Sequence, residues 1–483
     1  MSRFFVKRRA FGIRYLVVKR GVDMGVENHK YFGTDGFRGE ANKELTAAHA
    51  YRVGRFLGWY FKQSRLPDER VRIVIGKDTR ASSYMLEYAL AAGVASSGAD
   101  AYMLHVSSTP SVSYVASKEG FDAGVMITAS HNPFYDNGIK IVNKNGEKLD
   151  DATISLIEAY IDGDMQAIGV DDSDIPLAER EQIGRITDHS AGRNRYIGYL
   201  ISLASHSYKK LKIGLDAANG AVWMSAAAVF GALGAEVYTI GDAPDGTNIN
   251  RECGATDLRA LCALVKENSL DIAFAFDGDA DRCIAVDEHG EVVDGDGILY
   301  ILAKHLKSEG KLDRNTVVTT VMSNGGLGVS LARHGISTIE PDVGDRFVYE
   351  RMQSGDYSLG GEHSGHIILR KYATTGDGLL TAIILTEVMC ERKKPLSELV
   401  KGMKIYPRCT KNIKVSDKDR ILADREVQRC TAEVISELGG AGRVLLRKSG
   451  TEPKIRIMVE CEDESLCHAY AERIERAVID ANK

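Results

Sequence analysis

Three segments of the chain repeat one order of hydrophobic and polar positions. Each begins with an apolar run rich in β-branched residues, continues with a helix-length stretch rich in Ala, Leu and Gly, and reaches a second short apolar run. The first runs are Val71–Ile75, Leu211–Leu215 and Thr316–Val321, and the second runs are Ala101–Val106, Ala235–Ile240 and Ile336–Ile339. Apolar runs that alternate with helical stretches are typical of parallel βαβ units.

A third apolar run in each segment ends in a loop that is dense in polar groups. Asp122–Ile127 leads into Thr-Ala-Ser-His-Asn-Pro, Asp271–Phe276 into Asp-Gly-Asp-Ala-Asp-Arg, and Tyr357–Leu359 into Gly-Gly-Glu-His-Ser-Gly-His. Open α/β sheets bind ligands beyond the carboxyl ends of their strands. Alternation alone occurs in any α/β protein, but chance would not also place a polar loop after each third run. We therefore expect each segment to present one loop to a shared cleft.

The last part of the chain follows a different pattern. From about Lys404 it contains two strand-like runs, Lys411–Val415 and Ile455–Glu460, and two helical stretches, Asp419–Leu438 and Glu464–Asp480. Two strands and two helices indicate a small α+β domain. The predicted fold is α/β, with three similar mixed-sheet βαβ-type domains (30–170, 190–288 and 292–402) and a smaller C-terminal α+β domain (405–483) around a central cleft.

The composition excludes several classes of protein. The 483 residues are 44% hydrophobic and 27% charged, as is usual for a globular protein. A net charge of −5 is not the basic signature of a nucleic-acid binder, and no apolar run reaches the roughly 18 residues that a membrane span needs. The eight cysteines include no Cys-x-x-Cys pair, which favours reduced thiols in a cytoplasmic protein. We expect no nucleic-acid partner and no membrane partner.

The first 29 residues stand apart from this organisation. Residues 1–22 carry seven basic side chains and no acidic one. An organelle transit peptide is one interpretation, but the segment is poor in serine. We expect a disordered basic extension over 1–29, or an upstream start with Met24 as the real first residue.

The loop after Ile127 places a serine beside a histidine. Ser130 and His131 suggest a nucleophile with a proton shuttle nearby, although the same residues also suit an ST-turn closed by Asn-Pro. No Ser-His-Asp relay is evident and no Gly-x-Ser-x-Gly motif surrounds the serine, so the sequence does not indicate acyl transfer.

The second loop carries three carboxylates at alternate positions. Asp277, Asp279 and Asp281 can converge on one hard cation, and without a cation they would repel one another. Arg282 stands where an EF-hand needs glycine, and a strand precedes the loop, so an EF-hand is not predicted. Three protein ligands leave room for Mg²⁺ to share a phosphate oxygen. A solvated acidic turn is the alternative.

The third loop offers a carboxylate, a hydroxyl and two imidazoles between glycines. Glu362 and Ser364 can bind vicinal hydroxyl groups of a sugar. A zinc site through His363 and His366 is the alternative, but no cysteine and no third histidine lies near them in the sequence.

The last polar motif, Arg447–Arg456, is typical of an anion-binding loop, here called the phosphate cradle. Arg447 and Arg456 can bind phosphate through planar guanidinium groups, Ser449 and Thr451 add hydroxyl donors, and Gly450 exposes backbone N–H groups. A solvated basic turn is the alternative. A serine, a carboxylate metal site, a hydroxyl-binding loop and a phosphate cradle together favour phosphoryl transfer on a phosphorylated sugar.

These four motifs, in this order and spacing, resemble those of the α-D-phosphohexomutases from about Lys30 to the C-terminus. The resemblance implies three related α/β domains and a smaller fourth around a central cleft. Tyr31–Gly39, Ser130–Lys140 and Val343–Arg346 are similar to the branch of this family that acts on glucosamine phosphate. His363 also stands where the glucose and mannose branch usually has methionine.

The resemblance implies a role for each candidate residue. Ser130 would carry a phosphoryl group and, with Asp277, Asp279 and Asp281, would hold one Mg²⁺ per chain. Candidates for proton transfer are His131 and Lys140, and candidates for positioning the phosphoserine are Arg38 and Arg282. The substrate-binding residues would be Glu362, Ser364, Asp345, Arg447, Ser449, Gly450, Thr451 and Arg456.

The implied reaction interconverts glucosamine 6-phosphate and glucosamine 1-phosphate, on the route to UDP-N-acetylglucosamine. A sugar 1,6-bisphosphate would be both intermediate and activator, and a phosphosugar would be the partner molecule. A phosphoglucomutase or phosphomannomutase is the alternative within the family. A metal-dependent sugar phosphatase and a non-catalytic sugar-phosphate sensor are alternatives of other classes. By analogy with the family, a homodimer is also expected.

Overall fold

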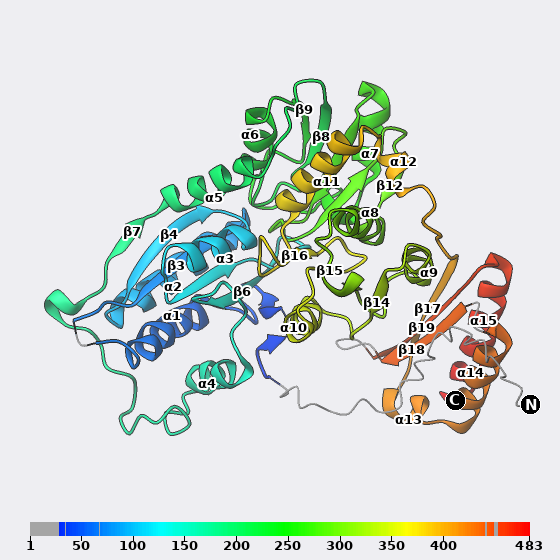
Figure 1. Ribbon diagram of the computed structural model, residues 1–483. Helices are drawn as coiled ribbons and strands as arrows, with labels where there is room; N and C mark the ends of the chain where they lie inside the picture. Colours follow the sequence, from blue (N-terminus) through cyan, green and yellow to red (C-terminus); the bar gives the residue numbers. More distant parts are fainter. Residues whose placement is uncertain (1–28, 34, 67, 440–441, 449–452) are drawn as a thin grey trace, which may run out of the picture. The chain divides into compact units, whose positions relative to one another are not determined.

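The computed structural model describes residues 29–33, 35–66, 68–439, 442–448 and 453–483. The expected basic extension, 1–29, lies outside these residues except for its last position. The described chain forms two compact units, one of 29–323 and Leu331–Met403 and the other of Asn324–Ser330 and Lys404–Lys483 (Figure 1). Within the described ranges, no helix combines the length and the apolar character needed to cross a membrane.

The first sheet has seven strands in the order β1-β2-β6-β5-β3-β4-β7. At its centre β3 (Arg72–Lys77) pairs in parallel with β4 (Asp100–Val106) on one side and β5 (Ala123–Ile127) on the other. The remaining strands are β1 (Phe32–Gly33), β2 (Gly36–Glu40), β6 (Asp136–Asn143) and β7 (Ile186–Asp188). All five residues of β5 are buried, as expected for a strand covered on both faces.

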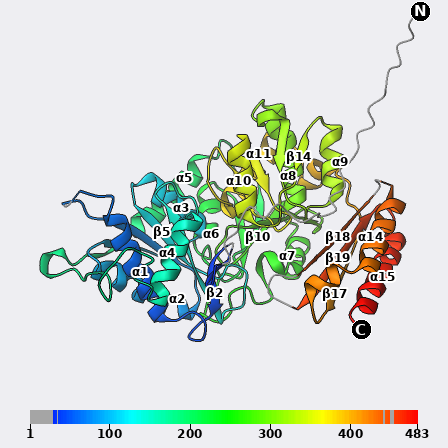
Figure 2. The same cartoon turned by 90° about the horizontal axis from the view of Figure 1, so that it is seen from below.

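Helices cover both faces of this sheet. On one face α1 (Ala47–Lys62) and α2 (Ala81–Ser96) enclose the larger apolar core, and on the other α3 (Thr109–Lys118) encloses a smaller one (Figure 2). The next helices along the chain are α4 (Asp151–Asp162) and α5 (Ser190–Ser202). Three of these helices begin at a side-chain cap, because Thr46, Ser108 and Asp150 each accept a backbone N–H of the first turn.

The second and third sheets repeat the parallel centre of the first. In the order β12-β11-β10-β8-β9, β8 (Lys212–Asp216) lies between β9 (Glu236–Ile240) and β10 (Ile272–Phe276). In the order β14-β13-β15-β16, β13 (Thr316–Val318) lies between β14 (Ser337–Ile339) and β15 (Leu359–Gly361). The antiparallel strands that follow are β11 (Cys283–Val286), β12 (Val292–Val293) and β16 (Ile367–Leu369). The predicted threefold repeat is therefore confirmed.

Two strands of the third sheet end elsewhere than predicted. The first strand stops at Val318, three residues before the predicted end, because β14 offers it only three partners. The third strand is Leu359–Gly361, not Tyr357–Leu359, because these residues pair with β16. The helices of these two sheets are α6 (Ser225–Ala232), α7 (Arg259–Asn268), α8 (Gly295–Ser308), α9 (Gly325–Arg333), α10 (Asp345–Gly355), α11 (Gly378–Arg392) and α12 (Leu396–Val400).

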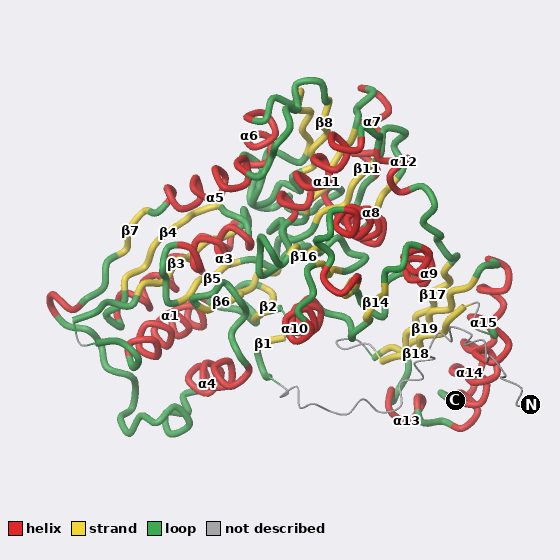
Figure 3. The backbone as a smooth tube through the Cα atoms, viewed as in Figure 1, coloured by secondary structure: helices red, strands yellow, loops and turns green. Residues whose placement is uncertain are grey.

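The C-terminal sheet has three antiparallel strands in the order β17-β19-β18, backed by helices (Figure 3). The elements are β17 (Arg408–Lys414), α13 (Lys418–Leu422), α14 (Arg425–Leu438), β18 (Gly442–Lys448), β19 (Lys454–Cys461) and α15 (Glu464–Ala481). The prediction of two strands and two helices was wrong in number. Arg443–Leu446 belongs to the edge strand β18, and Asp424 caps α14, which divides the expected helix Asp419–Leu438 in two.

Candidate functional site

The loop after β5 holds Ser130 in a strained backbone conformation. Its φ is 51°, in the left-handed region that few residues other than glycine adopt. The hydroxyl of Thr128 accepts the Ser130 N–H at 2.9 Å, and Asn250 donates to the Ser130 carbonyl at 2.8 Å. The ST-turn considered from the sequence is therefore made by Thr128, and it leaves the Ser130 hydroxyl available for other contacts.

Arg80, at the start of α2, binds the same loop. It was not among the residues selected from the sequence. The side chain is fully buried, and its Nε donates to Asp78 at 2.8 Å. The guanidinium also donates to four carbonyl oxygens of the loop, those of Ser130, Asn132, Pro133 and Asp136. A planar group with five N–H donors suits such a task. The available signal was its place in Gly-Lys-Asp-Thr-Arg, the polar end of the first repeated strand.

The loop after β10 brings three carboxylates to the serine. Ser130 Oγ donates to Asp277 Oδ2 at 2.6 Å, and each of Asp277, Asp279 and Asp281 offers an oxygen within 4.8 Å of the other two. The two loops touch closely, since a Cβ on Gly278 would lie 2.5 Å from the Ser130 carbonyl oxygen. The sequence therefore selected residues that the fold brings together, although they lie 147 positions apart.

The alternative of a solvated acidic turn is wrong, and the exclusion of an EF-hand is confirmed. The residues Asp277, Asp279 and Asp281 expose 0%, 0% and 3% of their surface, so the loop is not a solvated turn. A strand precedes it and another, β11, follows it, so it is not an EF-hand, in which two helices flank the loop.

Lys140 is the main counter-charge to this cluster. It lies on β6, and its Nζ donates to Asp279 at 2.8 Å and to Asp281 at 3.0 Å. Burial would lower the pKa of Lys140, but the surrounding Asp279, Asp281 and Asp35 carboxylates raise it well above its usual value. Thr109, at the start of α3, adds a hydrogen bond from its hydroxyl to Asp279. Thr109 is a second contributor that the sequence analysis did not select.

The charge on the three aspartates remains only partly balanced. Burial raises the pKa of Asp277 well above its usual value, and its neighbours Asp281 and Asp279 raise it further. Burial would also raise the pKa of Asp281, but Lys140 and His366 hold it well below its usual value. Asp279 Oδ1 is buried and accepts no hydrogen bond from any residue that the structure describes. A buried, unsatisfied carboxylate oxygen beside two others fits a hard divalent cation.

His131 and Arg282 lie beside the serine hydroxyl. His131 Nδ1 is 3.3 Å from Ser130 Oγ. Burial lowers the pKa of His131 to about 4, and the positive charges of Arg282 and Arg38 contribute, so the imidazole is neutral at pH 7. Arg282 donates its backbone N–H to Asp277 at 3.2 Å, and its side chain is 22% exposed. Arg38, on β2, forms an ion pair with Asp35.

The loop between β15 and β16 carries the predicted sugar-binding groups. Gly344 donates its N–H to Glu362 at 3.1 Å, and Ser364 Oγ lies 3.4 Å from the same carboxylate. His363 turns toward Asp294, at 3.1 Å, whereas His366 lies 3.7 Å from Asp281. In the described ranges, no group of three metal-ligating side chains contains both histidines, so the zinc alternative is wrong.

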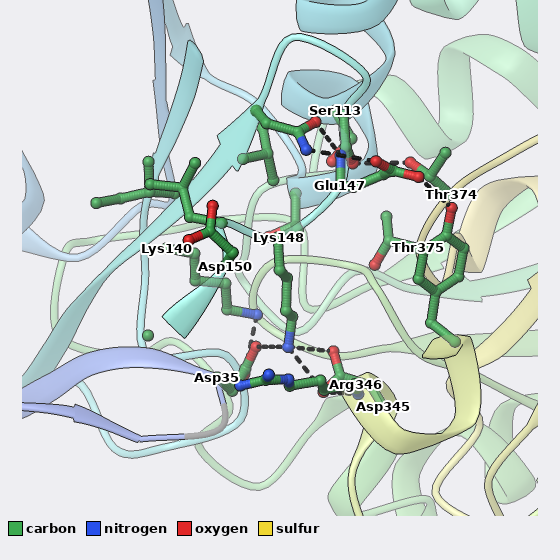
Figure 4. A pocket seen from close by; sticks show the side chains of 18 of the residues that line it. Asp35, Ser113, Lys140, Glu147, Lys148, Asp150, Asp345, Arg346, Thr374 and Thr375 are labelled. Atoms are coloured by element: carbon green, nitrogen blue, oxygen red, sulfur yellow. Dashed lines mark hydrogen bonds and ion pairs between the residues drawn. The ribbon is translucent and has the colours of Figure 1, made fainter. Parts of the chain in front are cut away.

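Asp345 is bound by a lysine. Lys148 Nζ lies 2.6 Å from Asp345, on α10, and 3.3 Å from Asp35, and Lys140 lies 3.1 Å from Asp35 on its other side (Figure 4). These contacts border a cavity of about 320 Å³ that is also lined by Asp281. We call Lys148, Asp345, Asp35, Lys140 and Asp281 the interdomain charge network, because they come from the first, second and third predicted domains.

The C-terminal unit places the two predicted arginines opposite each other. Arg447 on β18 and Arg456 on β19 are cross-strand partners. Burial lowers the pKa of Arg447, and the Arg456 charge adds to this effect. Like charges in directly opposed positions destabilise a sheet unless an anion lies between them. Ser449, Gly450 and Thr451 lie outside the described residues.

Four family models match successive parts of the chain. They are described as phosphoglucomutase/phosphomannomutase alpha/beta/alpha domains I, II and III and C-terminal domain, and they match residues 29–167, 194–290, 294–406 and 411–477. Together they span most of the sequence. The chain therefore belongs to the phosphoglucomutase/phosphomannomutase family, as its resemblance to the α-D-phosphohexomutases implied.

Relatives in this family are named phosphoglucosamine mutases. A phosphoglucosamine mutase from Lachnospira eligens is 55% identical over 92% of this chain and 97% of its own length. Another, from Anoxybacillus flavithermus, is 47% identical over 93% of this chain and 98% of its own length.

Solved structures share the fold. A phosphoglucomutase/phosphomannomutase family protein from Burkholderia thailandensis has a TM-score of 0.76 at 23% identity, over 93% of this chain and 97% of that one. The N-acetylphosphoglucosamine mutase of Aspergillus fumigatus, solved with GlcNAc-6P and magnesium, has a TM-score of 0.63 at 17% identity, over 94% and 96% of the two chains.

Replacing Arg80 should loosen the serine loop. In Arg80→Lys the charge beside Asp78 remains, but one ammonium cannot reach four carbonyl oxygens. Losing charge-assisted hydrogen bonds of about 1.5–3 kcal/mol each should accelerate amide hydrogen exchange across 128–136 by roughly tenfold or more. Arg70→Lys is the matched control, because Arg70 binds Asp100 and two carbonyls elsewhere on the sheet. Unchanged exchange in Arg80→Lys would contradict this role.

Proposed function

We propose that this protein interconverts glucosamine 6-phosphate and glucosamine 1-phosphate, as an intramolecular phosphotransferase of the isomerase class. The observation that carries the proposal is the 2.6 Å contact between Ser130 Oγ and a cluster of three buried aspartates. The names of relatives that are 47–55% identical over nearly the whole chain support the choice of glucosamine phosphate as substrate.

Asp277, Asp279 and Asp281 are the proposed ligands of one Mg²⁺, with an oxygen on Ser130 completing the set. The unsatisfied Asp279 Oδ1 and the raised pKa of Asp277, which follows from burial and the neighbouring carboxylates, support this assignment. When bound, Mg²⁺ would offset the negative charge on the transferring phosphoryl group. The magnesium in the Aspergillus fumigatus relative agrees with this choice of ion.

In the first half-reaction Ser130 is the phosphoryl donor. The bond between phosphorus and Ser130 Oγ breaks, a bond between phosphorus and the anomeric oxygen of glucosamine 6-phosphate forms, and the proton of the sugar hydroxyl passes through a proton carrier to Ser130 Oγ. Ser130 Oγ is itself buried, so the phosphoryl group must extend toward the partly exposed His131 and Arg282. His131, 3.3 Å from Oγ, and Lys140 are the proposed proton carriers, and Arg282 and Arg38 position the phosphoserine.

In the second half-reaction the resulting sugar 1,6-bisphosphate turns over, and its 6-phosphoryl group returns to Ser130. The same groups must therefore bind the sugar in two orientations. Glu362 and Ser364 are the proposed ligands of the ring hydroxyls, with Asp345 beside them. The proposed phosphate ligands are Arg447, Ser449, Gly450, Thr451 and Arg456. The opposed Arg447 and Arg456 side chains support this, because their mutual repulsion would be relieved by an anion.

Some broader expectations are also part of the proposal. The domain limits 30–170, 190–288, 292–402 and 405–483 are supported by the four sheets and by the separate family matches. A cytoplasmic location is supported by eight free thiols. A homodimer is proposed from analogy with the family.

Removing the serine hydroxyl should abolish the covalent step. With ³²P-labelled glucose 1,6-bisphosphate, Ser130→Ala should incorporate no label, and its kcat for the mutase reaction should fall by about 10³-fold or more. Ser117→Ala is the control, because Ser117 makes only a 3.0 Å hydrogen bond to a helix carbonyl. Full turnover in Ser130→Ala would rule out the phosphoserine. Release of inorganic phosphate without isomer formation by the wild type would favour the phosphatase alternative.

A substrate comparison should separate the branches of the family. We expect kcat/KM for glucosamine 6-phosphate to exceed the values for glucose and mannose 6-phosphates by at least about tenfold, because a site that binds an amino group discriminates by more than 1 kcal/mol. A coupled assay on the three sugars measures this ratio. A preference for glucose or mannose phosphate would contradict the proposed substrate but leave the phosphoserine mechanism in place.

A further inference from the structure

A second cavity, of about 450 Å³, lies between α8, α11 and α12, away from the serine loop. Isoleucine, valine and leucine side chains form the apolar part of its wall. The basic groups that line it are Lys304, His305, Lys307, His334, Arg392 and Lys394. A single carboxylate, that of Glu398, is part of the lining. Four permanent cations facing one anion are unusual in a chain whose acidic residues outnumber its basic ones, 67 to 62.

The cations of this basic cavity are poorly compensated. Lys394 lies 3.5 Å from Glu398, but both side chains are 54% exposed, where an ion pair contributes little. Arg392 approaches two rim carboxylates no closer than 3.8 Å. Lys304 pairs with no carboxylate in the described part of the chain. Its Nζ stands over the Tyr300 ring, 4.3 Å from the ring centre, and reaches one carbonyl oxygen at 3.5 Å.

The C-terminus of α8 stabilises only one of these four cations, Lys307. Cations are favourable in the last turn of a helix, and Lys307 donates to the carbonyl oxygens of His334 and Gly335 at 2.7 and 2.8 Å. Lys304 precedes that turn, Arg392 is the last residue of α11, and Lys394 follows the C-cap of that helix. Burial lowers the pKa of Lys304, and the positive charge of Lys394 lowers it further.

We propose that this basic cavity binds an organic phosphate, with Lys304, Arg392 and Lys394 holding the phosphate oxygens and the apolar wall covering the organic part. Three donors, one on α8 and two at and just after the end of α11, match a dianionic group, and the volume accommodates a ring that carries one or two phosphates. This site is separate from the serine loop. The N-terminus of α8 contacts the sugar-binding loop, where Gly295 donates to the His363 carbonyl, but Lys304 lies nine residues further along, about 14 Å away.

The test is calorimetric titration of the full-length protein with ADP, adenosine and inorganic phosphate as probes. We expect ADP to bind with 1:1 stoichiometry, inorganic phosphate to bind more weakly, and adenosine not to bind. Lys304→Gln and Lys394→Gln should each weaken ADP binding by roughly tenfold, the usual effect of losing one charge-assisted contact. Lys311→Gln removes the same charge from an exposed position on the same segment and should leave the affinity unchanged.

Three outcomes would overturn the proposal: no ADP binding to the wild type, wild-type affinity in both cavity variants, or an equal loss in Lys311→Gln, which would show only general electrostatic attraction. Because Lys394 is 54% exposed, Lys394→Gln should fold even if Lys304→Gln does not. Protection of 301–308 from hydrogen exchange by ADP provides an independent measurement on the unaltered chain. Absence of that protection would also count against the site.

Discussion

The structure depends on how three buried aspartates are compensated. Asp277, Asp279 and Asp281 share one loop with almost no access to water, where repulsion among carboxylates is strong. Lys140 satisfies oxygens of two of them, and Ser130 donates to the third. Asp279 Oδ1 stays buried without a hydrogen bond from the described residues. Asp277, Asp279 and Asp281 would hold a divalent cation whose charge would complete the balance, and Ser130 Oγ lies 2.6 Å from Asp277 Oδ2.

Ion pairs connect the charge of these aspartates to residues outside the serine and aspartate loops. The interdomain charge network leads from Asp281 through Lys140, Asp35 and Lys148 to Asp345, at the start of α10. Alternating charges of this kind fix relative positions, because removing one leaves its neighbours uncompensated. The part of the chain that carries the candidate sugar-binding loop is thereby connected to the loop of the three aspartates and to β6. Asp345 is therefore both a candidate substrate ligand and a structural partner of Lys148.

The sequence predicted the parts of the site that are local in the chain. Each polar loop follows a strand whose apolar run is readable, and parallel strands bring such loops to one edge, so Ser130 and the aspartates could be selected together. Arg80 stood at the polar end of a repeated strand, but its role could not be predicted, because the four carbonyl oxygens that it binds meet it only in the folded chain. Lys148 could not be selected, because only the folded chain brings Asp35 and Asp345 near it. The extra strand β18 and the break before α14 were missed because pairing with β19 and the Asp424 cap determine them.

The most direct test of the central claim is the ³¹P NMR spectrum of the phosphorylated enzyme with Mn²⁺ in place of Mg²⁺. If the aspartates hold the ion beside the phosphoryl group of Ser130, one equivalent of Mn²⁺ should broaden the phosphoserine resonance beyond detection. The resonance should stay sharp with Mg²⁺ and in the Asp279→Asn variant with Mn²⁺. A sharp resonance in the wild-type protein with Mn²⁺ bound would contradict the account.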